Sequence, residues 1–370
     1  MNLIDLKDLS PSMLTDFVLQ LGLPNYRAGQ IFAWLYKHGV TDFAEMTNLK
    51  KEIRQLLADK AWISSLQPQT IETSKDGTIK IAFQLDDQAL IESVLIPEGD
   101  RATLCISTQV GCAMGCAFCL TGTMGFSRNL RPAEIINQVL AVKKILATQI
   151  VTPEENQEIH EKTGLNNLVF MGMGEPLLNL DNLIIALDIL LDQRGLDFSE
   201  RRITVSTCGI VPKMRELGER TAAVNLAVSL HSVDDSLRSQ LMPVNKTYPV
   251  DTLLAACRAY PLPPRRRIMF EYILIDGVND SAEDAKKLVK KLRGIRCKIN
   301  LLPFNESKNM LYKCPPQARI DTFQQILWDA GFTVLVRTSR GADIGAACGQ
   351  LVVRPGTKTT GDCSSISDNG

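Results

Sequence analysis

The chain lacks a surplus of charge of either sign, because 41 Lys and Arg residues balance 41 Asp and Glu residues in a total of 370. Bulk charge therefore does not indicate a nucleic-acid partner, and any RNA contact must come from a local basic face. No apolar run approaches the ~20 residues that a bilayer-spanning helix needs, so we expect no membrane partner. The first residues carry acids and no long apolar core, which predicts no signal peptide and a cytoplasmic location.

The ten cysteines do not indicate a small disulfide-stapled scaffold, because the chain is long and 45% hydrophobic. Three of them, Cys112, Cys116 and Cys119, follow one another at spacings of four and three residues. Closely spaced thiolates suit iron–sulfur clusters or zinc. A structural zinc site normally has four protein ligands, whereas a four-iron cluster held by three cysteines keeps one iron open. The spacing is thus typical of the cluster loop of radical S-adenosylmethionine (SAM) enzymes, with zinc or reactive free thiols as alternatives.

The chain before this loop divides into two parts. Residues 1–60 have helical apolar spacing and predict a small helical domain. Residues 61–98 alternate and contain the turn pair Asp76 and Gly77, which predicts a small antiparallel β linker. Glu92 shares its predicted strand face with apolar residues, so it lies either at a wet strand end or in a site where burial would make it a usable proton acceptor. The basic residues of the helical part either contact phosphates or form an ordinary solvated surface: Arg27, Lys37, Lys50, Lys51 and Arg54.

Residues 99–345 alternate between strands and helices, which predicts an α/β fold with a parallel sheet that is curled or closed into a barrel. Together with the cluster loop, this pattern resembles the partial (βα)6-type barrel of radical SAM enzymes. The chemistry of such barrels lies at the carboxyl ends of the strands. The strands are expected at 102–108, 167–172, 202–206, 223–230, 268–275, 298–303 and 332–337. The helices between them are expected at 132–147, 180–193, 212–219, 249–259, 281–292 and 320–330. Residues 148–164 read as a longer loop or an extended helix, and residues 346–370 as a loop carrying Cys348 followed by a disordered tail.

Polar residues follow several of these strands and would meet at one barrel mouth. Gly174 permits close approach of the backbone to a ligand, and Glu175 places a carboxylate beside it. The stretch resembles the segment of radical SAM barrels that holds the amino group of SAM, although a plain turn is the alternative. His231 is either a ligand contact or a histidine that only hydrogen-bonds at a strand end. The full set of expected SAM contacts is Gly174, Glu175, Ser206, Ser229, Leu230, His231 and Asn305.

Two further cysteines, Cys348 and Cys105, each have a purely structural interpretation. Cys348 follows the last strand among small residues, which suits a loop that a bulky ligand approaches, but a buried inert thiol is the usual alternative. Cys105 in the first barrel strand reads on its own as a small apolar residue.

Taken together, these motifs resemble the RlmN/Cfr family of radical SAM RNA methyltransferases along the chain to about residue 354. The helical start resembles the accessory domain of the RlmN members. The matching segments are residues 26–32 and 39–49 in the helical start, and 101–105, 109–119, 125–130, 172–176, 229–231 and 347–351 in the barrel.

The resemblance implies methylation of carbon 2 of an adenosine in large-subunit (23S) ribosomal RNA, and of the adenosine 3′ of the anticodon in some tRNAs. It implies one [4Fe–4S] cluster on Cys112, Cys116 and Cys119, and two SAM molecules per turnover. One SAM methylates Cys348, and the other is cleaved to a radical that activates this methyl group for addition to the ring. Glu92 and Cys105 are then implied as the proton acceptor and as the thiol that releases the product through a transient disulfide.

The sequence is also compatible with two other functions. A Cfr-type enzyme would have the same fold and methylate carbon 8 instead. A non-catalytic, metal-bound RNA-binding module would need a fourth metal ligand and would have no use for both lone thiols. We expect a monomer that takes its electrons from a donor such as flavodoxin.

Overall fold

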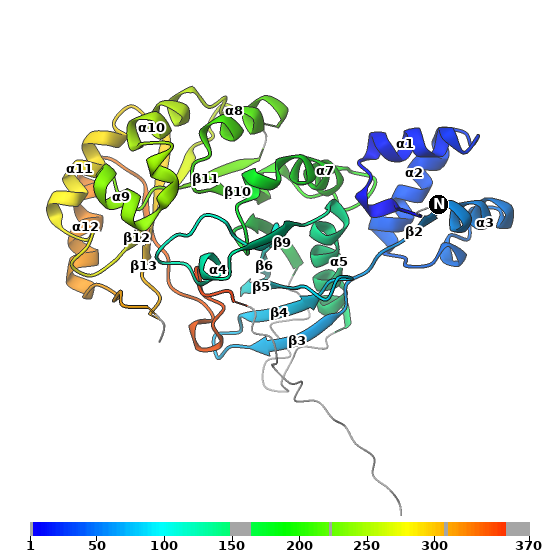
Figure 1. The fold of residues 1–370 in the computed structure, drawn as a ribbon, viewed down its shortest axis with the longest axis horizontal. Coiled ribbons are helices and arrows are strands. Elements are labelled where there is room, and N and C mark those ends of the chain that lie inside the picture. The colour runs from blue at the N-terminus through cyan, green and yellow to red at the C-terminus, as the bar shows by residue number, and fades with distance from the viewer. Residues whose placement is uncertain (1–2, 149–163, 222–223, 307–309, 353–370) are drawn as a thin grey trace, which may run out of the picture.

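A computed structural model describes residues 3–148, 164–221, 224–306 and 310–352. Its centre is a ten-stranded sheet in the order β14-β13-β12-β11-β10-β9-β6-β5-β4-β3 (Figure 1). Two small sheets accompany it: β1 (Ile4–Asp5) with β2 (Ala61–Trp62), and β7 (Gln109–Gly111) with β8 (Phe126–Asn129). The predicted loop or helix at 148–164 and the predicted tail lie almost wholly outside the described residues. Within the described ranges, no helix is long and apolar enough to cross a membrane.

Strands β6 and β9 to β14 run parallel and form the barrel wall. Their bounds agree with the expected strands to within a few residues: β6 Arg101–Cys105, β9 Gly164–Phe170, β10 Ile203–Thr207, β11 Asn225–Ser229, β12 Ile268–Leu274, β13 Cys297–Pro303 and β14 Val334–Val336. The helices that follow them are α5 Pro132–Thr148, α7 Leu180–Leu191, α8 Val211–Arg220, α9 Asp235–Leu241, α10 Val250–Ala259, α11 Ala282–Leu292 and α12 Gln317–Asp329. Each parallel strand thus reaches its neighbour through a crossover that includes at least one helix.

Antiparallel strands extend the sheet beyond β6. They are β3 Pro68–Thr73, β4 Ile79–Gln84 and β5 Leu90–Glu98, as the alternating pattern predicts. They do not stand apart as a separate linker sheet, because the second half of β5, residues Val94 to Glu98, pairs with the whole of β6. The residues of this linker therefore form one wall of the barrel.

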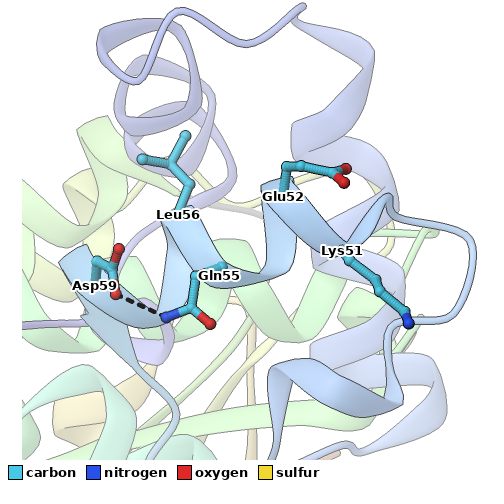
Figure 2. A pocket seen from close by; sticks show the side chains of 5 residues that line it. All are labelled: Lys51, Glu52, Gln55, Leu56 and Asp59. Carbon is cyan, nitrogen blue, oxygen red and sulfur yellow. Dashed lines mark hydrogen bonds between the residues drawn. The ribbon is translucent and has the colours of Figure 1, made fainter.

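The N-terminal helices α1 (Pro11–Gln20), α2 (Tyr26–Ala33) and α3 (Lys51–Lys60) gather at one side of the molecule, beyond α5 and α7 (Figure 1). The buried Lys7 ammonium ties this part to the barrel by donating to Ser64 O at 2.7 Å and to Asn137 Oδ1 at 2.9 Å. The outer face of α3 has no single sign of charge. Figure 2 shows acidic and basic side chains together in its shallow hollow, with Gln55 donating to Asp59 at 2.9 Å: Lys51, Glu52, Gln55, Leu56 and Asp59.

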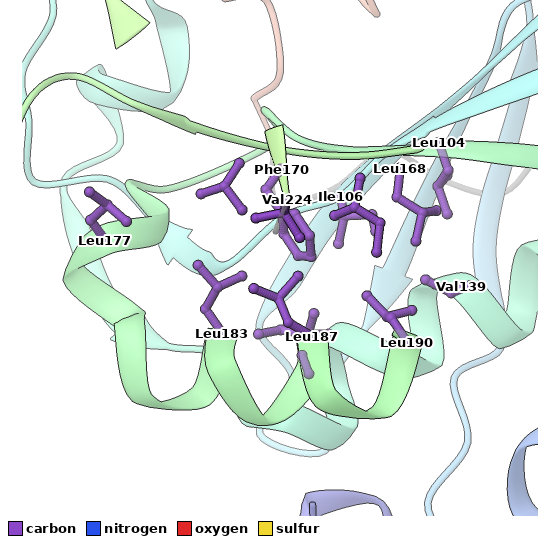
Figure 3. Close-up of a cluster of buried hydrophobic side chains, with 14 of the residues drawn as sticks. Leu104, Ile106, Val139, Leu168, Phe170, Leu177, Leu183, Leu187, Leu190 and Val224 are labelled. Atoms are coloured by element: carbon purple, nitrogen blue, oxygen red, sulfur yellow. The ribbon is translucent and has the colours of Figure 1, made fainter. Parts of the chain in front are cut away.

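The core lies between the sheet and its helices. Figure 3 shows Leu183, Leu187 and Leu190 of α7 facing Leu168 and the neighbouring strand residues, all of them buried. Because the helix-covered face of such strands is apolar, each strand appears in the sequence as a short apolar run. The opposite face forms the barrel interior and carries the polar residues.

Candidate functional site

The cluster loop is built from the end of β6 and a short hairpin. The hairpin strands are β7 (Gln109–Gly111) and β8 (Phe126–Asn129), and Cys112 N donates to Gly125 O at 2.8 Å. Gly111 has a φ of +73°, and a Cβ there would lie 1.9 Å from Gly125 O. Only glycine therefore permits the hairpin that starts the loop.

The three loop cysteines lie within electrostatic reach of one another. Burial, with a smaller contribution from Cys119, raises the pKa of Cys112 to about 11. Burial, with contributions from Cys119 and Cys112, also raises the pKa of Cys116. All three thiols are free and half-buried. A cluster of iron and sulfur would replace their protons and neutralise this repulsion.

Within the described residues, no three His, Cys, Asp or Glu side chains are grouped so as to hold a single metal ion. A four-iron cluster makes a different demand, because each thiolate binds its own iron atom and the sulfurs need not converge on one point. The donor set, which is three thiolates on one loop, therefore fits a cluster better than it fits one zinc ion.

Glu175, whose carboxylate we expect to contact the amino group of SAM, is buried beside this loop. Glu175 Oε2 accepts from Cys208 N at 2.8 Å, and its Oε1 accepts from Leu177 N at 3.1 Å. Burial raises the pKa of Glu175, and these hydrogen bonds oppose that shift. Gly174 has a φ of +100°, and a Cβ there would lie 2.5 Å from the side chain of Gln109. The predicted glycine and acid thus share one tight turn, and the charge of Glu175 reaches the cluster cysteines.

The ends of β10 and β11 are fixed by Arg238, a fully buried residue of α9. Its guanidinium donates to Cys208 O at 2.9 Å and to Ser229 O and Leu230 O at 3.0 Å each. These bonds shape the turn that carries the expected SAM contacts. Ser206 sits one strand away on the same sheet face, since it pairs with Ala227, two residues before Ser229. Neither Arg238 nor its short helix was predicted from the sequence, because nothing local distinguishes a buried arginine from a surface one.

His231 is held as a neutral, hydrogen-bonded histidine. Its Nδ1 accepts from Ile273 N at 2.9 Å, and burial lowers its pKa to about 3. Its ring meets the ring of Phe118 edge-on at 4.6 Å, so it also supports the cluster loop. These contacts agree with the second interpretation of His231, as a histidine that hydrogen-bonds at a strand end, and they do not bear on a contact to SAM.

The loop of Cys348 docks directly on the cluster loop. Leu120 N donates to Gly349 O at 2.7 Å, and Thr121 Oγ1 donates to Leu351 O at 2.7 Å. Asn305 Nδ2 donates to Cys348 O at 3.2 Å. Residues separated by some 230 positions are therefore brought together at the mouth of the barrel.

Cys348 and Cys105 lie at this mouth as free thiols. Cys348 is exposed to solvent, yet the protein that surrounds it, together with the charges of Glu271 and Cys119, raises its pKa to about 12. Burial and the nearby Cys348 raise the pKa of Cys105 to about 12. The electrostatic effect of Cys348 on Cys105 indicates that the two thiols lie near each other, and the raised pKa of each favours the protonated thiol at neutral pH.

Glu92 completes the group from β5. It is buried, and its Oε2 accepts from Val352 N at 3.0 Å. Burial raises its pKa to about 7, against the lowering effect of Lys80. A carboxylate with this pKa is suited to accept a proton near neutral pH.

A second buried carboxylate, that of Glu271, was not predicted from the sequence. Glu271 of β12 lies across from Ser229 on β11 and Asn300 on β13, and Asn300 Nδ2 donates to its Oε1 at 2.9 Å. Burial raises the pKa of Glu271 to about 7. The one acid in an otherwise apolar strand could have indicated a site residue, but the strand was interpreted only as an apolar run.

Comparisons with known proteins agree with this architecture. Residues 4–63 match the family described as ribosomal RNA large subunit methyltransferase N-terminal domain, and residues 106–291 match the radical SAM superfamily. A protein of Desulfotalea psychrophila named dual-specificity RNA methyltransferase RlmN is 54% identical over 355 residues, covering 96% of each chain. A protein of the same name from Geobacter sulfurreducens is 55% identical over 349 residues, covering 94% of this chain and 92% of its own.

A solved structure supports the fold independently. The crystal structure of a radical SAM methyltransferase from Sphaerobacter thermophilus superposes with a TM-score of 0.84 at 43% identity. The match covers 94% of this chain and 98% of the other.

Proposed function

Because the chain belongs to the RlmN family of radical SAM RNA methyltransferases, we propose that it methylates carbon 2 of an adenosine in large-subunit rRNA. The relatives are named dual-specificity enzymes, and we extend the proposal to the adenosine 3′ of the anticodon in some tRNAs. Family membership makes the chain a SAM-dependent enzyme, which sets aside the reading as a non-catalytic binding module. Methylation of carbon 8 of the same rRNA adenosine is the alternative, and the match to the N-terminal domain favours carbon 2.

One observation carries the proposal: two lone thiols and a buried carboxylate meet beside the three-cysteine loop. Cys348 reaches this place because its loop bonds to Leu120 and Thr121, and Glu92 because it accepts from Val352 on the same loop. A plain SAM-dependent methyl transfer would need none of these three groups together. A route through a methylated cysteine needs all of them.

We assign the cluster to Cys112, Cys116 and Cys119. When bound, SAM supplies the methyl group and, with one electron from the cluster, the radical that activates it. The SAM contacts are expected at the strand ends described above: Gly174, Glu175, Ser206, Ser229, Leu230, His231 and Asn305. The burial of the Glu175 carboxylate beside the cluster loop supports its proposed role in accepting from the ammonium group of SAM.

Cys348 is the methyl carrier in this scheme. Its exposure lets a substrate reach the sulfur, and its thiol must lose a proton before the sulfur can attack a methyl group. One SAM is used for this transfer and a second for activation. Addition of the activated carbon to adenine would then join Cys348 covalently to the RNA. The unpaired electron left on the ring must be taken up by a one-electron acceptor, a role that the oxidised cluster on Cys112, Cys116 and Cys119 would supply when bound.

Glu92 and Cys105 release the product. Glu92 accepts the proton from the ring carbon. The Cys105 sulfur then attacks the Cys348 sulfur, the bond between that sulfur and the transferred carbon breaks, and the carbon takes up a proton to complete the methyl group. The resulting disulfide between Cys105 and Cys348 must be reduced by an external thiol before the next turnover.

The test is anaerobic reconstitution of the full chain with iron, sulfide, SAM, a reductant and RNA fragments, followed by mass spectrometry of the nucleosides. We expect 2-methyladenosine from the wild type and none from Cys348→Ala. Product at carbon 8 alone would replace the proposal by its alternative. Undiminished product from Cys348→Ala would eliminate the methyl-cysteine route.

A further inference from the structure

Lys80 lies between the proposed proton acceptor and the loop of the methyl carrier, and the scheme above gives it no role. It belongs to β4, and its side chain is only 12% exposed. Its ammonium donates to Ile344 O at 2.6 Å and lies 3.7 Å from Glu92 Oε1. It also pairs with Glu72 Oε1 at 3.2 Å.

The loop of Cys348 is attached to this wall of the barrel on both sides of the cysteine. Before it, Lys80 holds the carbonyl of Ile344. After it, Glu92 Oε2 accepts from Val352 N at 3.0 Å. Cys348 therefore sits on a span whose two ends rest on the two partners of a single ion pair.

The turn between β3 and β4 secures the same loop. Asp76 Oδ2 accepts from Gly341 N at 2.9 Å, and Asp343 Oδ2 accepts from Lys75 N at 3.2 Å. These contacts fasten the loop by backbone and by exposed side chains. Lys80 is the member of the group that also reaches Glu92.

We propose that Lys80 is a positioning residue for the release step, which holds the Glu92 carboxylate in place against the Cys348 loop. This rests on the role proposed above for Glu92. Lys80 touches neither the cluster loop nor an expected SAM contact among the hydrogen bonds and ion pairs of the described chain. It acts through Glu92 and through the backbone of the loop.

The charges around Glu92 give this role a direction. The titratable groups on its face of β3 to β6 are Lys80 on β4, Glu72 on β3 and Cys105 on β6, with Glu98 and Arg101 farther away at the paired ends of β5 and β6. Burial raises the pKa of Glu92, the positive charge of Lys80 lowers it, and the negative charge of Glu72 raises it. Removing Lys80 should therefore move the acidic limb of the release step to higher pH, and removing the charge of Glu72 should move it to lower pH.

The experiment uses the full reconstituted chain, with Cys348 first methylated by SAM and the methylated fraction measured by intact mass. RNA and reductant are then added for a single turnover between pH 6 and 9. Two quantities are followed per methylated enzyme: 2-methyladenosine, and the covalent protein–RNA adduct on a denaturing gel. The variants are Lys80→Met, Lys80→Arg, Glu72→Gln and Glu92→Gln.

We expect Lys80→Met to shift the acidic limb upward by about one pH unit, which makes release about tenfold slower below it and lets the adduct accumulate. Lys80→Arg keeps the charge and should stay close to the wild type. Glu72→Gln should shift the limb in the opposite direction. Lys75→Met is the matched control, because Lys75 is exposed and meets the loop through its backbone N–H.

A Lys80→Met profile that overlays the wild type, or an equal defect in Lys80→Arg, would overturn the proposal. If Lys80→Met does not fold, Glu72→Gln decides alone: an acid shift supports the role, and an unmoved profile removes it. Glu92→Gln separates the two proposals. Full release by this variant would refute the role of Glu92 itself, whereas a dead Glu92→Gln beside an unaltered Lys80→Met would refute only that of Lys80.

Discussion

Glu271 should make the protein less stable as the pH rises, and Glu271→Gln should remove that effect. Glu271 is 6% exposed, and burial raises the pKa of its carboxyl to about 7 from 4.5. A group whose pKa is raised on folding binds its proton more tightly in the folded state. Its contribution is therefore present below pH 4.5 and is lost as the pH rises through 7.

The difference between the two pKa values corresponds to about 3 kcal/mol of unfolding free energy above pH 7. Glutamine keeps the oxygen that accepts from Asn300 at 2.9 Å, and it adds no charge. Glu271→Gln should thus be more stable than the wild type by up to about 3 kcal/mol at pH 8, and this difference should shrink to about 1 kcal/mol at pH 5. Arg337 and Lys298 already lower the pKa of Glu271, so their attraction is included in this figure.

The assay is denaturant unfolding of both proteins at several pH values, with equal iron content in every sample. Glu98→Gln is the matched control, because Glu98 ends β5 and is exposed. An equal stability difference at pH 5 and pH 8 would refute the reasoning, since a packing effect does not titrate. A less stable Glu271→Gln at pH 8 would show that the ionised carboxylate is a favourable partner in the barrel.

Three further substitutions test the site. Cys105→Ala should leave the RNA attached to Cys348, seen as a slow-migrating adduct on a denaturing gel, and free product in its place would refute the releasing role. Arg238→Met should cost about 3 kcal/mol, because three buried carbonyl oxygens lose their donor, and should weaken SAM binding in calorimetry; unchanged unfolding and affinity would contradict this. Gly349→Ala should slow methylation of Cys348 in intact-mass assays, because a Cβ would lie 2.9 Å from Phe118 O at a φ of +81°, and wild-type rates would show that the loop tolerates the shift.

Much of the barrel was predictable because its parallel strands are buried and therefore read as short apolar runs. The helix after each strand was predictable for the same local reason, with periodic apolar residues and a proline near the start of α5 and α8. α9 was missed because seven residues give too short a pattern to identify. The pairing of β5 with β6 was also not predictable, since strand neighbours are chosen by contacts between distant segments.

The residues of the site also divide into those with a local sequence pattern and those without one. The three cluster cysteines are close in sequence, so their spacing alone predicts their chemistry. Cys105 and Cys348 have no local pattern of their own, and only the family resemblance gave them roles. The structure brings the two thiols together, but their catalytic roles remain predictions.

The residues that escaped prediction share a physical property. Arg238, Glu271 and Lys80 are charged groups whose partners come from other elements, so no window of sequence contains both sides of the interaction. Lys80 shows the consequence most clearly. Its carbonyl partner, Ile344, is 264 positions away, and its carboxylate partner, Glu92, is on the next strand. A search for motifs finds the groups that react, whereas the groups that set their charge and position emerge only once the chain is folded. If Lys80→Met moves the pH profile and Lys75→Met does not, the difference lies entirely in these non-local contacts, because the two substitutions remove the same charge five residues apart.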